Sequence, residues 1–186
     1  MKFMFNIPFL TGLVGSFILV AGAAWPEPKT AKVPVKSIKN WLFAIGALAM
    51  LIFAILGYQQ GGQVFFVILE ILVVIAGTLM MLNTNDRTDA VIITISGISL
   101  IIWSLYLFEG YGTIIFILGL IGIGLGYAFK MKTLRRDVCL TLGSILIAIF
   151  SYMEPNWIFF WLNVFFALFS GYYMVKHLIH KPSLTS

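Results

Sequence analysis

The sequence predicts an all-α membrane protein with seven transmembrane helices, built as two parallel three-helix repeats joined by a linker helix. Composition predicts the membrane class. Of the 186 residues, 61% are hydrophobic and only 10% are charged, and the mean hydropathy is +1.02. A soluble domain of this size could not bury that much apolar surface in one core, so a bilayer must be the solvent. We expect a single transmembrane domain, 1–186, in the inner (plasma) membrane.

Seven apolar segments supply the predicted helices, because each approaches the ~20 residues that cross a bilayer. Polar, turn-rich connections separate them, such as QQGGQ and NTNDRTD. The sixth segment is short and could gain a turn from 135–137. The predicted spans are 8–24, 41–58, 64–82, 90–107, 113–129, 138–152 and 157–175.

The first segment also resembles a secretory signal. Lys2 precedes an apolar stretch that ends in Ala21-Gly22-Ala23, a small-residue pattern typical of a cleavage site. We expect this segment to be retained as a helix, because the internal repeat requires it.

The basic residues predict the orientation. With seven spans, every lysine and arginine except Lys2 falls in the connections 25–40, 83–89 and 130–137 or in the tail, all on one side. Basic loops stay in the cytoplasm, so we expect the chain to run N-out and C-in. This bias also explains the formal charge of +5, and no nucleic-acid partner is expected.

Three pairs of segments share features in the same order, which predicts the repeat. GLVG in the first segment resembles GLIG in the fifth, 107 residues later, and IGALAMLIF in the second resembles LGSILIAIF in the sixth, 97 residues later. In the third pair, Glu70 and Asn163 lie 93 residues apart, each before a patch of small residues. We therefore predict repeats at 8–82 and 113–175. The linker helix at 90–107 makes them parallel.

This 3+1+3 arrangement resembles the SWEET sugar transporters and the PnuC-type transporters of nicotinamide riboside and related vitamin precursors. WPEPKTAKVPVKS is similar to the PQ-loop pattern of that superfamily, with Glu27 in place of the usual glutamine. NWLFAIGALAMLIFAIL resembles the aromatic-rich start of the second helix in PnuC-type proteins. The sequence departs from this pattern at two places. The second half has no proline after LGYAFKMK, and the third helix has Glu70 where an asparagine or glutamine is commoner in that superfamily.

The resemblance implies a transporter that moves a nicotinamide riboside-like vitamin precursor or a sugar by alternating access at the repeat interface. Asn163 falls where such families often place a substrate-facing asparagine on the last helix. Facilitated diffusion and proton coupling are both open.

Glu70 is the principal candidate for substrate binding, because it is the one charged residue in VFFVILEILVVIAG. An ionised side chain at the bilayer centre costs ~2.5–3.5 kcal/mol on insertion scales, so such a group normally faces the bundle interior or a wet cavity. Glu70 either contacts a solute or is a protonated group bonded to a neighbouring helix. By repeat symmetry Asn163 would face it, or serve only to join helices.

Four further residues are candidates for substrate binding. Trp161 and Trp103 lie near the predicted outer boundary, where tryptophans also serve as interfacial anchors. Tyr58 ends the second span on that side and could form a gate or a polar cap. Asn40 could line the inner mouth.

The side chains that could serve catalysis or hold a cofactor are few, so we expect neither an enzyme nor a cofactor. His177 and His180 lie in the tail beside lysines, where we expect solvated charges, and the sequence has no HExxH or phosphate-binding motif. A single cysteine, Cys139, excludes an internal disulfide and a cysteine-based metal cluster. The expected partners are a small-molecule solute, the lipid bilayer and, in a homo-oligomer, a second copy.

The alternative function is a receptor or an assembly subunit that does not transport. It predicts a dry, packed centre around Glu70 and Asn163, whereas a transporter predicts a polar cavity bounded by both.

Overall fold

The computed structural model describes residues 7–25, 34–82, 84–131 and 133–179. Lys2, Glu27 and His180 lie outside the described residues, and so does most of the PQ-like connection. The elements are α1 (Ile7–Ala24), the short 3-10 helix η1 (Pro34–Lys36), α2 (Ile38–Gln59), α3 (Phe65–Leu82), α4 (Asp86–Tyr106), α5 (Tyr111–Ala128), α6 (Leu134–Met153) and α7 (Trp157–Ile179).

The prediction of seven membrane-crossing helices is confirmed. In the described ranges, seven helices have the length and apolar composition to span a bilayer. No strand occurs in these ranges. The chain is therefore a multi-pass, all-α membrane protein.

Three helices begin at least three residues earlier than predicted, each after a polar cap: α2 at Ile38 after Ser37, α4 at Asp86 after Asn85, and α6 at Leu134 after Thr133. Asn85 accepts a 2.7 Å hydrogen bond from the backbone N of Thr88 and starts α4 at Asp86. Thr133 accepts a 3.4 Å bond from the backbone N of Arg136 and starts α6 at Leu134. A side-chain oxygen at this position satisfies an amide that the first turn leaves unpaired. Hydropathy missed the first turn of α4 because that turn is polar, whereas the possible extra turn at 135–137 of the sixth segment is confirmed.

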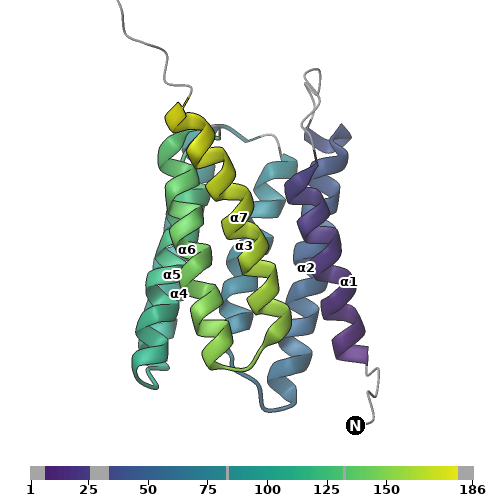
Figure 1. The fold of residues 1–186 in the computed structure, drawn as a ribbon, viewed down its shortest axis with the longest axis vertical. Helices are drawn as coiled ribbons and strands as arrows, with labels where there is room; N and C mark the ends of the chain where they lie inside the picture. Colours follow the sequence, from purple (N-terminus) through teal and green to yellow (C-terminus); the bar gives the residue numbers. More distant parts are fainter. Residues whose placement is uncertain (1–6, 26–33, 83, 132, 180–186) are drawn as a thin grey trace, which may run out of the picture.

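Six of the helices form a closed ring, and the seventh lies outside it. Each helix in the order α1, α2, α3, α5, α6, α7 contacts the next, and α7 returns to α1. α4 packs against α3 and α5 (Figure 1). The helices run along the long axis of the bundle, so their connections gather at its two ends. We call the end at which α1, α3 and α5 finish the basic end, because every lysine and arginine of the chain except Lys2 lies in the sequence next to these helix ends, in the last turns of α7 or after them.

Glycines bring two pairs of neighbouring ring helices, α1 with α2 and α5 with α6, into backbone contact. A Cβ added at Gly46 of α2 would lie 2.6 Å from the backbone N of Leu19 on α1. A Cβ added at Gly143 of α6 would lie 2.6 Å from the backbone N of Ile123 on α5. No side chain fits at those distances, so glycine permits the close approach of both helix pairs.

Buried phenylalanines fill the ring toward the end opposite the basic end. Phe66 and Phe159 stack, with ring centroids 4.4 Å apart and planes 13° apart. Phe53 lies 5.6 Å from Phe159, and Phe150 lies 5.4 Å from Phe66, on either side of this pair. We call the following set the phenylalanine layer, all at most 9% exposed: Phe53, Phe65, Phe66, Phe116, Phe150 and Phe159.

Candidate functional site

A cavity of about 350 Å³ lies within the ring of six helices, next to the phenylalanine layer. All six ring helices contribute lining residues, and the described part of α4 contributes none. The lining includes Trp25 and Met131, which are 45% and 46% exposed, near the basic end. The cavity thus extends from the middle of the bundle to one of its ends.

Glu70 and Asn163 bound the deep part of this cavity. Glu70 follows Phe66 on α3 by four residues, and Asn163 follows Phe159 on α7 by four residues. Four residues advance a helix by ~6 Å, roughly one turn. Because Phe66 and Phe159 stack on each other, the two polar side chains lie on facing helices one turn beyond the stack.

The two polar groups differ in how they are satisfied. Asn163 Nδ2 donates a 2.9 Å hydrogen bond to the carbonyl of Phe159 on its own helix. Glu70 is 1% exposed, and its Oε2 accepts no hydrogen bond from the described residues. A buried acceptor left without a partner costs ~1–3 kcal/mol, more when charged. A solute that donates to this oxygen would remove that cost.

Aromatic rings form the walls between Glu70 and the basic end. Phe43 of α2 lies edge-on to Tyr127 of α5 and to Phe166 of α7, with centroid distances of 6.2 and 6.5 Å. All three line the cavity. Phe43 follows Asn40 by three residues, and Phe166 follows Asn163 by three residues. The three rings, which we call the aromatic walls, therefore stand between the deep polar pair and the mouth.

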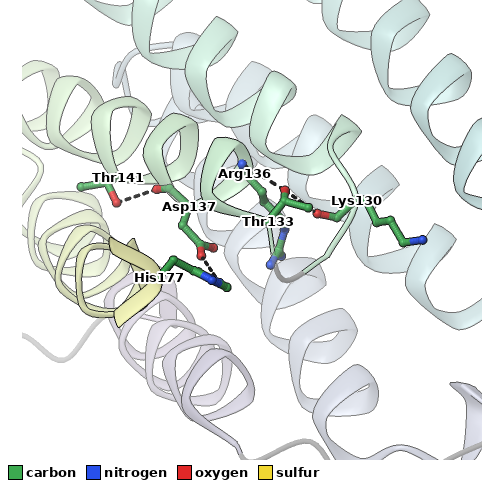
Figure 2. Close-up of polar contacts among 6 residues, drawn as sticks. All are labelled: Lys130, Thr133, Arg136, Asp137, Thr141 and His177. Atoms are coloured by element: carbon green, nitrogen blue, oxygen red, sulfur yellow. Dashed lines mark hydrogen bonds and ion pairs between the residues drawn. The ribbon is translucent and has the colours of Figure 1, made fainter. Parts of the chain in front are cut away.

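Polar contacts tie neighbouring helices together at the mouth. Asn40 Nδ2 of α2 donates a 3.0 Å hydrogen bond to the carbonyl of Met80 on α3. On the other side, His177 Nε2 of α7 lies 3.3 Å from Asp137 Oδ2 of α6 (Figure 2). Asp137 Oδ2 accepts no hydrogen bond within the described residues, so this contact is electrostatic and becomes an ion pair when His177 is protonated.

The local sequence explains why Asp137 is buried. It lies in the first turn of α6, after the cap at Thr133, and Thr141 donates a 2.7 Å hydrogen bond to its backbone carbonyl (Figure 2). Its carboxylate side chain is 7% exposed. Arg136, the preceding residue, also lines the cavity.

The structure brings together three of the six predicted site residues. Glu70, Asn163 and Asn40 line one cavity. Tyr58, Trp103 and Trp161 are not among its lining residues, and they are 53%, 41% and 55% exposed on the bundle. Trp161 precedes Asn163 by two residues, about 200° around the helix, so the two cannot share a wall.

Other lining residues were not identified from the sequence. His177 was expected to be a solvated tail residue. That expectation is corrected, because α7 continues to Ile179 and carries His177 to the cavity beside Asp137. The possible extra turn at 135–137 is confirmed and places Asp137 inside α6, but nothing in the sequence indicated that this side chain lines a cavity. The residues of the aromatic walls could not be predicted from the sequence, because phenylalanines occur on every side of these helices.

Comparisons with protein-family models, curated proteins and solved structures found no match. Within the described part of the chain, His, Cys, Asp and Glu side chains form no group of three or more that could hold a metal ion.

Proposed function

We propose that this chain is an inner-membrane transporter, which moves a small polar solute by alternating access between two three-helix halves. The observation that carries the proposal is the cavity, which Glu70 and Asn163 bound together and which ends at the phenylalanine layer. An ionisable side chain within a membrane-spanning helix raises the free energy of the folded protein. Such a side chain usually contacts a solute or lines an ion pathway.

Contacts within the phenylalanine layer support the repeat. The sequence offset of 97 residues relates Phe53 to Phe150, and the offset of 93 relates Phe66 to Phe159. The contact of Phe53 with Phe159, at 5.6 Å, thereby corresponds to that of Phe150 with Phe66, at 5.4 Å. The stacked pair Phe66–Phe159 would lie on the pseudo-two-fold axis, and Glu70 and Asn163 would face each other across it.

The order of helices around the ring also supports two equivalent halves. α1–α2 corresponds to α5–α6, α2–α3 corresponds to α6–α7, and α7–α1 corresponds to α3–α5, and each of these pairs is in contact. α4 lies outside the ring, as a linker helix would. Parallel repeats of this kind place a solute site between the halves near mid-membrane.

With the N-out, C-in orientation, the cavity faces the cytoplasm. The phenylalanine layer then closes the outer side. Transport requires a second state in which the layer separates and the Asn40 and Asp137 sides of the mouth approach each other. The resemblance to SWEET and PnuC-type transporters makes a sugar or a nicotinamide riboside-like compound the first solutes to test.

The alternative function is that of a receptor or an assembly subunit. In such a protein we expect a dry, packed centre around Glu70 and Asn163. The presence of a 350 Å³ cavity lined by both residues favours transport over this rival.

Efflux from proteoliposomes tests the proposal. Vesicles containing the purified chain are loaded with a mixture of hexoses, nucleosides and small amines, and the loss of each solute is followed by mass spectrometry. We expect selective efflux that Asn163→Leu abolishes and that Ser99→Ala, on the exposed surface of α4, leaves unchanged. Equal retention of every solute in protein-containing and empty vesicles would sink the proposal.

A further inference from the structure

The deep part of the cavity offers few hydrogen-bonding partners to a solute. Glu70, Asn163 and Ser144 supply polar side chains there, together with the Tyr127 hydroxyl. The residues around them are apolar or aromatic: Leu69, Val73, Ile123, Leu162, Phe43 and Phe166. A sugar needs a partner for each hydroxyl group that it buries, and each unmet group is costly. The lining instead fits a ligand with an apolar body and a single polar group.

The strongest polar feature in this region is a carboxylate. Glu70 Oε2 is buried and accepts no hydrogen bond from the described residues. A ligand that carries a positive charge would supply both a donor and a counter-ion to this group.

The basic residues that line the cavity, Lys39, Arg136 and His177, come from the helix ends at its mouth. Asn40, next to Lys39, donates to the carbonyl of Met80, ten residues beyond Glu70 on α3. Ten residues advance a helix by ~15 Å. Arg136 and His177 lie at the same end, where Asp137 is within 3.3 Å of His177. Glu70 Oε2 accepts no hydrogen bond from any of these groups, so a ligand can reach this oxygen as its donor.

The aromatic walls favour the same class of ligand. Phe43, Tyr127 and Phe166 line the cavity beside Glu70, and Phe43 contacts the other two rings edge-on. Aromatic faces attract organic cations, by ~0.5 to 2 kcal/mol or more as water is excluded. The volume of about 350 Å³ lies at the small end of ligand pockets, which span roughly 300–1,000 Å³.

We infer that the cavity is a binding site for a small organic cation, with Glu70 as the counter-ion and Phe43, Tyr127 and Phe166 as the surrounding rings. The inference rests on the proposed function in taking this cavity as the solute site, and it narrows the solute from polar molecules in general to amines and quaternary ammonium compounds. Asn163 orients the ligand opposite the carboxylate.

Equilibrium binding to the purified full chain tests the inference with two matched pairs. Choline is compared with its uncharged carbon analogue 3,3-dimethylbutan-1-ol, and benzylammonium with benzyl alcohol. Calorimetry is expected to give about tenfold or greater preference for a cation over its neutral partner. Glu70→Gln should remove that preference, while the matched control Glu109→Gln, at an exposed glutamate near the opposite end, should keep it.

A second pair of variants keeps the test decisive if Glu70→Gln folds poorly. Phe166→Leu should weaken cation binding several-fold, and Phe165→Leu should not, because Phe165 is 43% exposed and lies outside the cavity lining. Equal affinity for cations and neutral partners, or binding that neither Glu70→Gln nor Phe166→Leu changes, overturns the inference.

The vesicle experiment separates this inference from the proposed function. Efflux of neutral sugars or nucleosides without cation binding would support transport and refute the cation site. Cation binding that depends on Glu70, without movement of any solute across the bilayer, would support the site and refute transport.

Discussion

The rings of Phe66 and Phe159 stack 4.4 Å apart at the centre of the helix ring. Each ring precedes, by one turn on its own helix, a polar residue that bounds the cavity: Glu70 on α3 and Asn163 on α7. The stacked rings and the candidate site are therefore built on the same two helices. A movement of α3 relative to α7 that parts the stacked rings also changes the separation of Glu70 and Asn163.

Phe159→Ala is expected to destabilise the protein by about 3–5 kcal/mol, because truncating a buried phenylalanine leaves a cavity. The ring is 0% exposed and contacts both Phe53 and Phe66. Unfolding in detergent, followed by circular dichroism, measures the loss. Phe165→Ala, at a ring that is 43% exposed, should cost far less, and similar losses for the two variants would contradict a packed layer.

Gly46→Ala is expected to destabilise the α1–α2 contact by about 1–3 kcal/mol, as overpacking does in other cores. The added Cβ would lie 2.6 Å from the backbone of Leu19, which has no flexible end to move aside. Gly57→Ala on the same helix is the control, because nothing lies within 4 Å of a Cβ at that position.

Thermal unfolding of the two glycine variants in the same detergent gives the comparison. Gly57→Ala should be neutral or stabilising by up to ~1 kcal/mol, because alanine favours the helix over glycine. If Gly46→Ala is as stable as Gly57→Ala, the close approach of α1 and α2 is wrong.

Thiol labelling can locate the floor of the cavity. In a Cys139→Ser background, Ser144→Cys should react with a small cationic methanethiosulfonate added at the basic end, because Ser144 lines the cavity. Ser151→Cys, two turns further along α6, should stay unmodified, because Ser151 is 0% exposed and does not line the cavity. Intact-protein mass spectrometry reports the modified fraction, and equal labelling would mean that the phenylalanine layer is not a barrier.

The sequence was sufficient to predict the helices but not all of their first turns. Hydropathy locates apolar spans well because a bilayer tolerates little else. Hydropathy does not detect a polar first turn, and it therefore missed the start of α4 at Asp86. For α6, the short apolar segment itself indicated the extra turn at 135–137, and the helix starts at Leu134. Asp137 lies in that turn, but hydropathy gave no sign that its side chain is buried beside His177.

The sequence located three residues of the candidate site, of which two interrupt an apolar span and the third, Asn40, directly precedes one. The two that interrupt a span are Glu70 and Asn163, and both line the cavity. Tryptophans near the ends of the spans did not identify the site, because tryptophans also anchor helices at the membrane interface. Trp103 and Trp161 are both exposed. Phe43 and Phe166 could not be chosen from the chain's 17 phenylalanines without knowing how the ring closes.

Glu70→Met is expected to keep or raise stability while abolishing solute binding. The carboxylate oxygen Oε2 is buried with no hydrogen-bond partner in the described residues, so removing it eliminates an unmet polar group worth ~1–3 kcal/mol. Methionine has a similar length and adapts to irregular space. A residue retained for function at a cost in stability behaves in this way.

Parallel measurements on Glu70→Met and Asn163→Leu make the test specific. Asn163 donates a 2.9 Å hydrogen bond to the carbonyl of Phe159, so its replacement removes a satisfied bond, and we expect a loss of ~0.5–1.5 kcal/mol. Chemical unfolding in detergent gives both values, and calorimetry with choline gives the binding. A large loss of stability in Glu70→Met would show instead that the carboxylate joins helices, and the case for a solute-binding glutamate would fail.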